Sequence, residues 1–243
     1  MKTLLLVLVL GWTSLSMGAF PKASIQELSG AYQNSAGKAR AKAFQFNEHD
    51  FGENVEFDVE KQGTSLYLST EEQEFEFKDL PLAVDKIEGV KWNGLNLESS
   101  EAKIDLALKS FIGQYTDQVL NLHGLRVICD HAGGSGVGEY LNACLNNKGH
   151  LSFSKVETTS NGKKTTIGDF SLSTHNGRLR FQIKASAKVK GKGEISYKDN
   201  VVTIKITEAK SSGFSVRSRF FKELRKLQSE NIKVKRPYIT ISL

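Results

Sequence analysis

Residues 165–208 read TTIGDFSLSTHNGRLRFQIKASAKVKGKGEISYKDNVVTIKITE, and they contain the clearest hairpin signal of the chain. Both residues of Asn176–Gly177 tolerate the positive φ that a type I′ turn requires. A two-residue turn there places residues opposite one another on one face, in the pairs Thr174–Leu179, Leu172–Phe181 and Phe170–Ile183. A register slip of one residue would move this set into water, so the turn and the pattern predict the same hairpin.

The second strand of this hairpin is expected to continue over residues 178–198. Its odd-numbered residues are apolar or small, whereas its even-numbered residues are mostly Lys and Arg. Strands rarely exceed about ten residues, so we expect a bend at Gly191–Gly193. Asp199–Asn200 then turns the chain back. One apolar and one basic face predict a mainly β fold, a long and curved antiparallel meander sheet that wraps something apolar.

The first residues have the features of an export signal. Lys2 precedes the apolar run LLLVLVL at residues 4–10, and small residues follow at Gly18 and Ala19. This run is too short to span a bilayer, which takes about 20 apolar residues; an uncleaved anchor is the alternative. We expect residues 1–19 to be a signal peptide of a periplasmic or secreted protein. Residues 20–243 then form a single β-rich domain, which could be subdivided near 129–149.

The chain has two cysteines, Cys129 and Cys144, and in an exported protein they predict one disulfide. Closing so short a loop contributes roughly 3 kcal/mol in the chain-entropy model. Metal ligation is the alternative, but the nearby His131 and His150 give no standard zinc spacing. We therefore expect neither a metal site nor a cofactor.

Charge is distributed unevenly along the chain. Residues 1–120 carry 11 Lys and Arg against 18 Asp and Glu, whereas residues 121–243 carry 22 against 9. The basic half would attract lipid head groups or anionic envelope polymers. A solvated outer sheet face explains the alternating lysines equally well, and the export signal argues against nucleic acid.

Other segments fit a meander of strands less clearly. Residues 29–37 are small and polar, which suggests a loop or a short helix. Asn93–Gly94 is a second turn signal. Residues 119–129 alternate as a strand, but their parity shifts at His123–Gly124, which predicts a bulge.

Two further runs carry a family resemblance. Residues 94–113 (GLNLESSEAKIDLALKSFIG) and 119–125 (VLNLHGL) resemble the repeated strand pattern of AsmA-type envelope proteins, and NIKVKRPYITI at 231–241 is similar to small exported LmeA-type lipid-binding proteins. The resemblance covers about a third of the chain. It implies a curved antiparallel sheet whose apolar concave face holds lipid acyl chains. The chain lacks the length of the large bridge-forming members, which favours a short carrier or accessory protein.

The glycine-rich segment between the cysteines does not predict catalysis. Gly133–Gly138 lacks the Gly-Lys-[Ser/Thr] ending of a phosphate loop. Asp130, His131 and Ser135 are close in sequence, but a catalytic triad is assembled by geometry. The simpler interpretation is a loop that leads into a short helix over residues 139–145, or a lid over a groove. We expect no enzymatic activity, and a hydrolase is the weakest of the functions considered.

The clearest helix follows residue 215. Phe220, Phe221, Leu224 and Leu227 share one face, and Ser215 is a candidate N-cap. The other face is basic, with Arg217, Arg219, Lys222, Arg225 and Lys226. Such a helix can lie on an anionic membrane surface and meet lipid head groups. Alternatively, it covers the open end of the sheet with its apolar face.

These features predict an exported, non-enzymatic protein that binds a lipid or another apolar ligand along a curved sheet. The expected lining residues are Phe170, Leu172, Leu179, Phe181, Ile183, Ile204 and Ile206. The same residues would form a closed core in the alternative, an envelope scaffold that binds a partner protein or an anionic polymer through its basic face.

Overall fold

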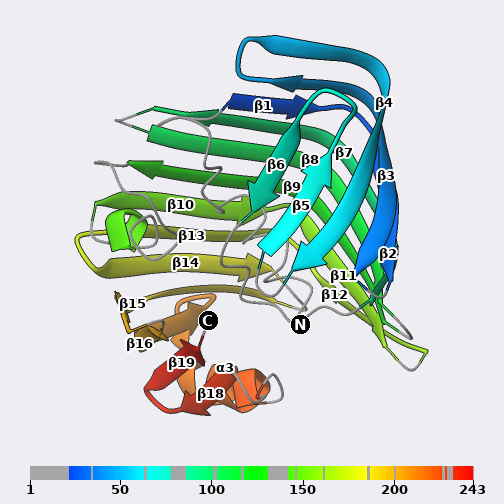
Figure 1. The fold of residues 1–243 in the computed structure, drawn as a ribbon. Coiled ribbons are helices and arrows are strands. Elements are labelled where there is room, and N and C mark those ends of the chain that lie inside the picture. Colours follow the sequence, from blue (N-terminus) through cyan, green and yellow to red (C-terminus); the bar gives the residue numbers. More distant parts are fainter. Residues whose placement is uncertain are drawn as a thin grey trace.

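The computed structural model is mainly β, with its strands in one large antiparallel sheet (Figure 1). It describes residues 22–33, 35–62, 65–77, 86–100, 103–115, 118–130, 142–145, 147–160, 162–184, 187–199, 201–225, 228 and 232–242. The expected signal peptide and the Gly133–Gly138 segment lie outside these ranges.

Within the described ranges, the chain consists of strands, a short helical segment at residues 142–145 and a helix near its end. The first strands are β1 (Lys22–Ile25), β2 (Leu28–Gln33), β3 (Ala36–Phe46), β4 (His49–Gln62), β5 (Ser65–Ser69), β6 (Glu74–Phe77), β7 (Lys86–Ser99), β8 (Lys103–Tyr115) and β9 (Gln118–Asp130). After the disulfide segment follow β10 (Lys148–Phe153), β11 (Lys155–Ser160), β12 (Lys163–Ile167), β13 (Phe170–His175), β14 (Arg178–Lys184), β15 (Lys188–Lys198), β16 (Val201–Ser211) and β17 (Phe214–Ser215). The chain ends with α3 (Arg217–Leu224), β18 (Ile232–Lys235) and β19 (Tyr238–Ser242).

Neighbours in sequence are mostly neighbours in the sheet, as a meander requires. Among the exceptions are β1 and β2, which lie between β3 and β7 and pair with both. The pairs β9–β11, β10–β13 and β16–β19 are also not consecutive in the chain. Residues 29–33 and 36–37 are therefore not a loop or a helix, as their composition suggested, but belong to β2 and β3, which pair antiparallel. Gly30 lies so close to Ala39 that a Cβ at position 30 would be 2.8 Å from the Cβ of Ala39. The small residues thus allow close strand approach.

The central hairpin is confirmed. Asn176 and Gly177 adopt φ of 49° and 71°, and β13 pairs with β14 in the predicted register, with Leu172 opposite Phe181. The prediction of a single long strand over residues 178–198 was wrong. β14 ends at Lys184, and β15 returns antiparallel with Lys188 opposite Lys184. Gly191 and Gly193 lie opposite Phe181 and Leu179, where a larger residue would not fit. The pairing of β15 with β16 shifts register between Lys192 and Gly193, within the stretch where a bend was expected.

A crease crosses the sheet from β3 to β13, at the same level in each strand. It passes through Lys42–Ala43, Gln26–Glu27, Asn93–Gly94, Lys109–Ser110, His123–Gly124, Ser154–Lys155 and Gly168–Asp169. At the crease the buried residues step by three instead of two, as from Leu108 to Phe111 and from Leu122 to Leu125. This parity shift is the bulge expected at His123–Gly124.

Glycine makes the crease possible at two positions. Gly94 and Gly124 have φ of 64° and 62°, a region that glycine enters without strain. Both lie opposite Lys109 of β8. Asn93–Gly94 is therefore not the chain reversal that its sequence suggested, because β7 continues through it to Ser99. Kinks that coincide across neighbouring strands concentrate the curvature of a sheet, and Figure 1 shows β7, β8 and β9 bending along their length.

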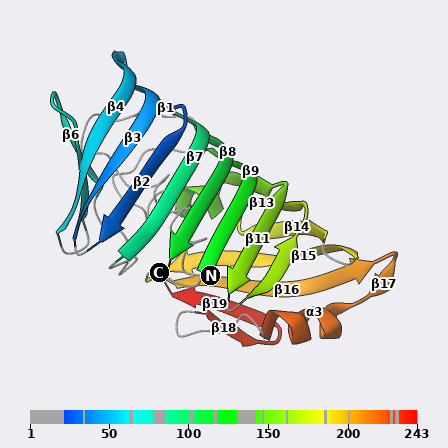
Figure 2. The same ribbon diagram turned by 90° about the vertical axis from the view of Figure 1, so that its right-hand side faces the viewer.

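One face of the sheet is apolar across nearly its whole width. A single row of directly paired residues runs from β3 to β16 through Phe46, Ala23, Leu97, Leu106, Val127, Leu151, Leu172, Phe181, Gly191 and Ala209. The core consists of three clusters on this face: one around Phe44, one around Phe111, and one around Phe221 of α3. Figure 2 shows α3, β18 and β19 together beneath β15 and β16.

Candidate functional site

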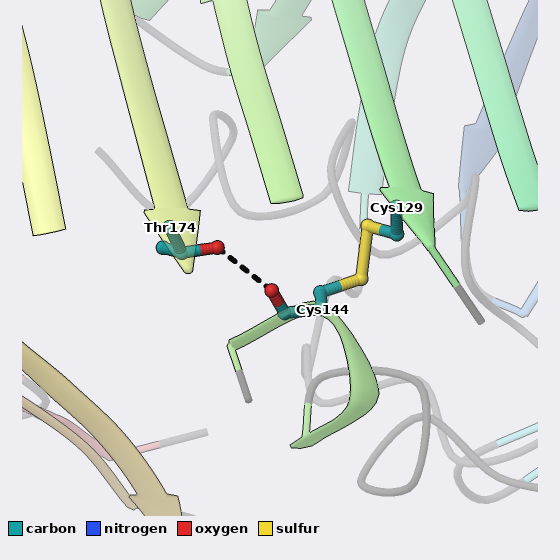
Figure 3. The surroundings of a disulfide bond; sticks show 3 residues. All are labelled: Cys129, Cys144 and Thr174. Atoms are coloured by element: carbon teal, nitrogen blue, oxygen red, sulfur yellow. Dashed lines mark hydrogen bonds between the residues drawn. A yellow bond between two sulfur atoms is a disulfide. The ribbon is translucent and has the colours of Figure 1, made fainter. Parts of the chain in front are cut away.

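The disulfide fixes a short helical segment against one end of the sheet. Cys129 at the end of β9 is joined to Cys144, as predicted, and residues 142–145 are helical (Figure 3). The Thr174 hydroxyl of β13 donates a buried hydrogen bond of 2.7 Å to the carbonyl of Cys144. The N–H of Gly177 donates to the carbonyl of Leu145 at 3.0 Å. The disulfide and the central hairpin thus hold the same segment from two sides.

Three of the seven expected lining residues are sealed from solvent. Leu179, Phe181 and Ile206 are buried, and they belong to the cluster that contains Phe221 of α3. Phe221 itself is 0 % exposed, and the ring of Phe220 stacks on that of Phe181 with centroids 5.3 Å apart. Here α3 covers the sheet with its apolar face, one of the two arrangements considered for this helix.

The other four lining residues remain partly exposed. Phe170, Leu172 and Ile183 lie on β13 and β14, and Ile204 lies on β16. Phe153 of β10 extends this surface, because its ring stacks on Phe170 at a centroid distance of 4.9 Å. We call the half-buried set the apolar strip: Leu151, Phe153, Ile167, Phe170, Leu172 and Ile183. Leu151, Phe153 and Ile167 were not predicted as lining, because the bend at Ser154 and Gly168 divides their strands into short pieces.

The opposite face of β14, β15 and β16 is basic. Arg180 lies opposite Lys192, Lys184 opposite Lys188, and Lys190 opposite Lys210. Like charges directly opposite each other are destabilising unless something neutralises them. A surface cleft of about 670 Å³, the lysine cleft, is lined by Arg180, Lys188, Lys190, Gly191, Lys192, Glu208, Lys210, Ser212 and Gly213.

A second cleft of about 600 Å³ lies beside it, at the start of α3. This arginine cleft is lined by Thr207, Glu208, Lys210, Ser215, Val216, Arg217, Ser218, Arg219 and Arg236. Glu208 and Lys210 line both clefts. The helix begins one residue later than expected, because Val216 and not Ser215 is its N-cap, and no side chain makes a capping hydrogen bond.

The predicted basic residues of the helix are only partly brought together. Arg217 and Arg219 line the arginine cleft, whereas Lys222 and Arg225 are exposed outside it. Lys226 lies outside the described residues. Arg236 and Lys210 were missed, because they come from the β18–β19 turn and from β16, and no local pattern links them to the helix.

Ion pairs perturb three carboxylates on the polar surface of the sheet. Hydrogen bonds from Lys164 and Lys155 lower the pKa of Glu157 to about 2. A hydrogen bond from Lys210 lowers the pKa of Glu208. A hydrogen bond from Arg126 likewise lowers the pKa of Asp105. Each of these groups is therefore ionised at neutral pH, as its ion pairs require.

Other chemistry has little support in the described ranges. There, no group of three or more His, Cys, Asp or Glu is placed to hold a metal ion. Asp130 is exposed at the end of β9, and His131 and Ser135 lie outside the described residues. None of the helices described is long and apolar enough to cross a membrane. Comparison with family models, with curated proteins and with solved structures found no match.

Proposed function

We propose that this protein is an exported, non-enzymatic carrier that binds a lipid or another apolar ligand against the apolar face of its creased sheet. The observation that carries this proposal is the apolar strip, where large side chains on neighbouring strands remain partly exposed. The Cys129–Cys144 disulfide is compatible with an oxidising, exported location.

The energetics favour an acyl chain as the ligand. Burying apolar surface gains roughly 0.8 kcal/mol per CH₂ group, so a strip of this kind needs no special motif to hold a long chain. The strip is a ladder of directly opposed residues, with Leu151 opposite Leu172 and Phe153 opposite Phe170. A chain lying across the strands would contact each of them in turn.

A charge placed in the strip tests this function. We expect Phe170→Glu to reduce binding of a fluorescent phospholipid analogue at least tenfold while the protein remains folded. Ser171→Glu is the matched control, because it adds the same charge one residue further along β13, where alternate side chains face opposite sides of the sheet. Failure of the wild-type protein to bind the analogue would refute the proposal. A loss of folding in Phe170→Glu, with the control intact, would assign the strip to a closed core.

A second candidate function is a scaffold that binds an anionic polymer or a protein partner through the lysine cleft. The excess of cations favours it, because Glu208 pairs with both Lys210 and Lys192 while Lys190 faces Lys210, and an anionic partner would relieve the remaining repulsion. The variant Lys188→Glu/Lys192→Glu should then weaken binding to a soluble anionic polymer. The variant Lys38→Glu/Arg40→Glu on β3 serves as a control far from the cleft, because it reverses the same number of charges. Equal losses in both variants would point to net charge alone.

A further inference from the structure

The tip of the β16–β17 turn combines an exposed aromatic ring with clustered cations. Phe214 is 78 % exposed, the most exposed of the large hydrophobic residues in the described ranges. Ser212 and Gly213, just before it, line the lysine cleft, and Ser215, just after it, lines the arginine cleft. Figure 2 shows β17 at one extremity of the molecule, beside α3. The ring therefore projects from the end of the protein between two basic surfaces.

The arginine cleft is built from the backbone at a gap in the sheet edge. β19 pairs with β16 over Val201–Lys205, and β17 pairs with it at Lys210–Ser211. Between them, the N–H of Ile206 donates to the carbonyl of Pro237, and the N–H of Val216 donates to the carbonyl of Ala209, both at 2.9 Å. The elements around the cleft are thus tied to the edge of β16.

Within the described residues, carboxylates do not balance the charges of the arginine cleft. Its one carboxylate, Glu208, is bonded by Lys210 at 2.9 Å. Among the described residues, no ion pair connects a carboxylate to Arg217, Arg219 or Arg236. Crowded like charges repel one another, and an anion in the cleft would remove that repulsion.

Two observations on the arginine side chains indicate how an anion would be held. Arg236 donates from Nη1 to the hydroxyl of Ser218 at 2.9 Å, which fixes its guanidinium beside the start of α3. The Nε atom of Arg217 is buried and has no hydrogen-bond partner within the described residues. A buried donor without an acceptor is unusual and often marks a missing ion or water. Guanidinium groups bind phosphate oxygens with paired hydrogen bonds.

We propose that this end of the protein docks on anionic membranes, with a phospholipid phosphate in the arginine cleft and the Phe214 ring among the acyl chains. The source of the phosphate follows from Phe214, because a soluble phosphate ester would give an exposed aromatic ring no apolar partner. Basic residues beside an inserted aromatic side chain are a general solution for binding anionic lipid surfaces. The inference goes beyond the carrier function, since it requires no ligand on the apolar strip.

Vesicle sedimentation with the full chain tests the proposal. We expect binding to vesicles of phosphatidylglycerol and phosphatidylcholine, and little binding to phosphatidylcholine alone. Arg217→Gln/Arg236→Gln should weaken the binding at least tenfold, and Arg219→Gln, at an exposed position, about fivefold. The control Lys38→Gln/Arg40→Gln removes two charges from β3 and should change the binding less than twofold.

The aromatic ring is tested separately. Phe214→Ser should weaken vesicle binding about tenfold without changing the thermal midpoint, because the ring is already in water. Phe214→Trp should show a blue-shifted emission on vesicles. The proposal is overturned if the control pair weakens binding as much as the arginine pair, which would indicate unspecific charge attraction. Tight binding of inorganic pyrophosphate without vesicle binding would also overturn it. Loss of vesicle docking with retained binding of the fluorescent lipid analogue would refute this inference alone and leave the carrier function intact.

Discussion

The contact between Gly191 and Phe181 offers a sharp test of how β14, β15 and α3 pack. A Cβ placed on Gly191 would fall on the Cζ and Cε1 atoms of Phe181, and it would lie 2.6 Å from the carbonyl oxygen of Glu208. The ring cannot swing away, because it is buried and Phe220 of α3 stacks on it. The oxygen belongs to the backbone of β16. Gly191→Ala must therefore displace a packed ring and a strand together.

The expected cost follows from that geometry. Overpacking a well-filled core typically costs about 1–3 kcal/mol, and with two rigid neighbours we expect a value near 3 kcal/mol. For a chain of this size, each kcal/mol lowers the thermal midpoint by about 2–4 °C. Urea unfolding monitored by circular dichroism measures the free energy directly. Gly89→Ala is the matched control, because its Cβ would meet nothing within 4 Å.

A double-mutant cycle separates the two contacts. Phe181→Leu removes the clashing ring atoms, so in combination with Gly191→Ala it should lose about 1 kcal/mol less than the sum of the single losses. The remaining cost comes from the Glu208 carbonyl. If Gly191→Ala is as stable as Gly89→Ala, β15 does not approach Phe181 closely, and the packing argument fails. Strict additivity in the cycle would place the clash on the backbone alone.

Three further perturbations probe other parts of the fold. The low pKa of Glu157 contributes stability above about pH 4.5 that is lost as the pH falls towards about 2. In urea unfolding, the free energy of unfolding of Glu157→Gln should therefore fall less steeply with decreasing pH than that of the wild-type protein. The same pH dependence in both proteins would contradict the ion pairs. Cys129→Ser/Cys144→Ser should cost about 3 kcal/mol, and reductant should lower the wild-type protein to the same urea midpoint and leave the variant unchanged. Thr174→Val leaves the buried carbonyl of Cys144 unpaired and should cost about 1–3 kcal/mol, whereas Thr174→Ser should retain most of the stability in thermal melts.

The sequence predicted the central hairpin because its cause is local. Asn176 and Gly177 supply both left-handed residues of the turn, and the alternation on either side permits one register. The reversal between β14 and β15 was missed for an equally local reason. Lys184 faces Lys188, so odd-numbered residues stay on one face through the turn, and the pattern is the same as that of an uninterrupted strand. The intervening Ala-Ser-Ala carries no turn signal.

The role of a left-handed glycine depends on its neighbours, which the sequence does not show. Asn93–Gly94 and Asn176–Gly177 are identical dipeptides, yet one crosses the crease within a strand and the other reverses the chain. The difference lies in the adjacent strands, since Gly94 bends beside Lys109 and Gly124. All seven candidate lining residues were likewise assigned from alternation alone, but the burial of three of them depends on α3. The arginine cleft was not predicted, because Arg236 joins it from a distant turn.

The crease also constrains how the length of this chain can vary. Each strand that crosses it carries its inward side chains on one parity before the crease and on the other parity after it. If a single residue were lost there, the hydrogen-bonded ladder could re-form. Every side chain beyond the deletion in that strand would then point to the opposite face of the sheet. Neighbouring strands would have to shift together to restore the pattern. Insertions and deletions in relatives of this protein should therefore be confined to the hairpin loops, and strand lengths across the crease should be held constant.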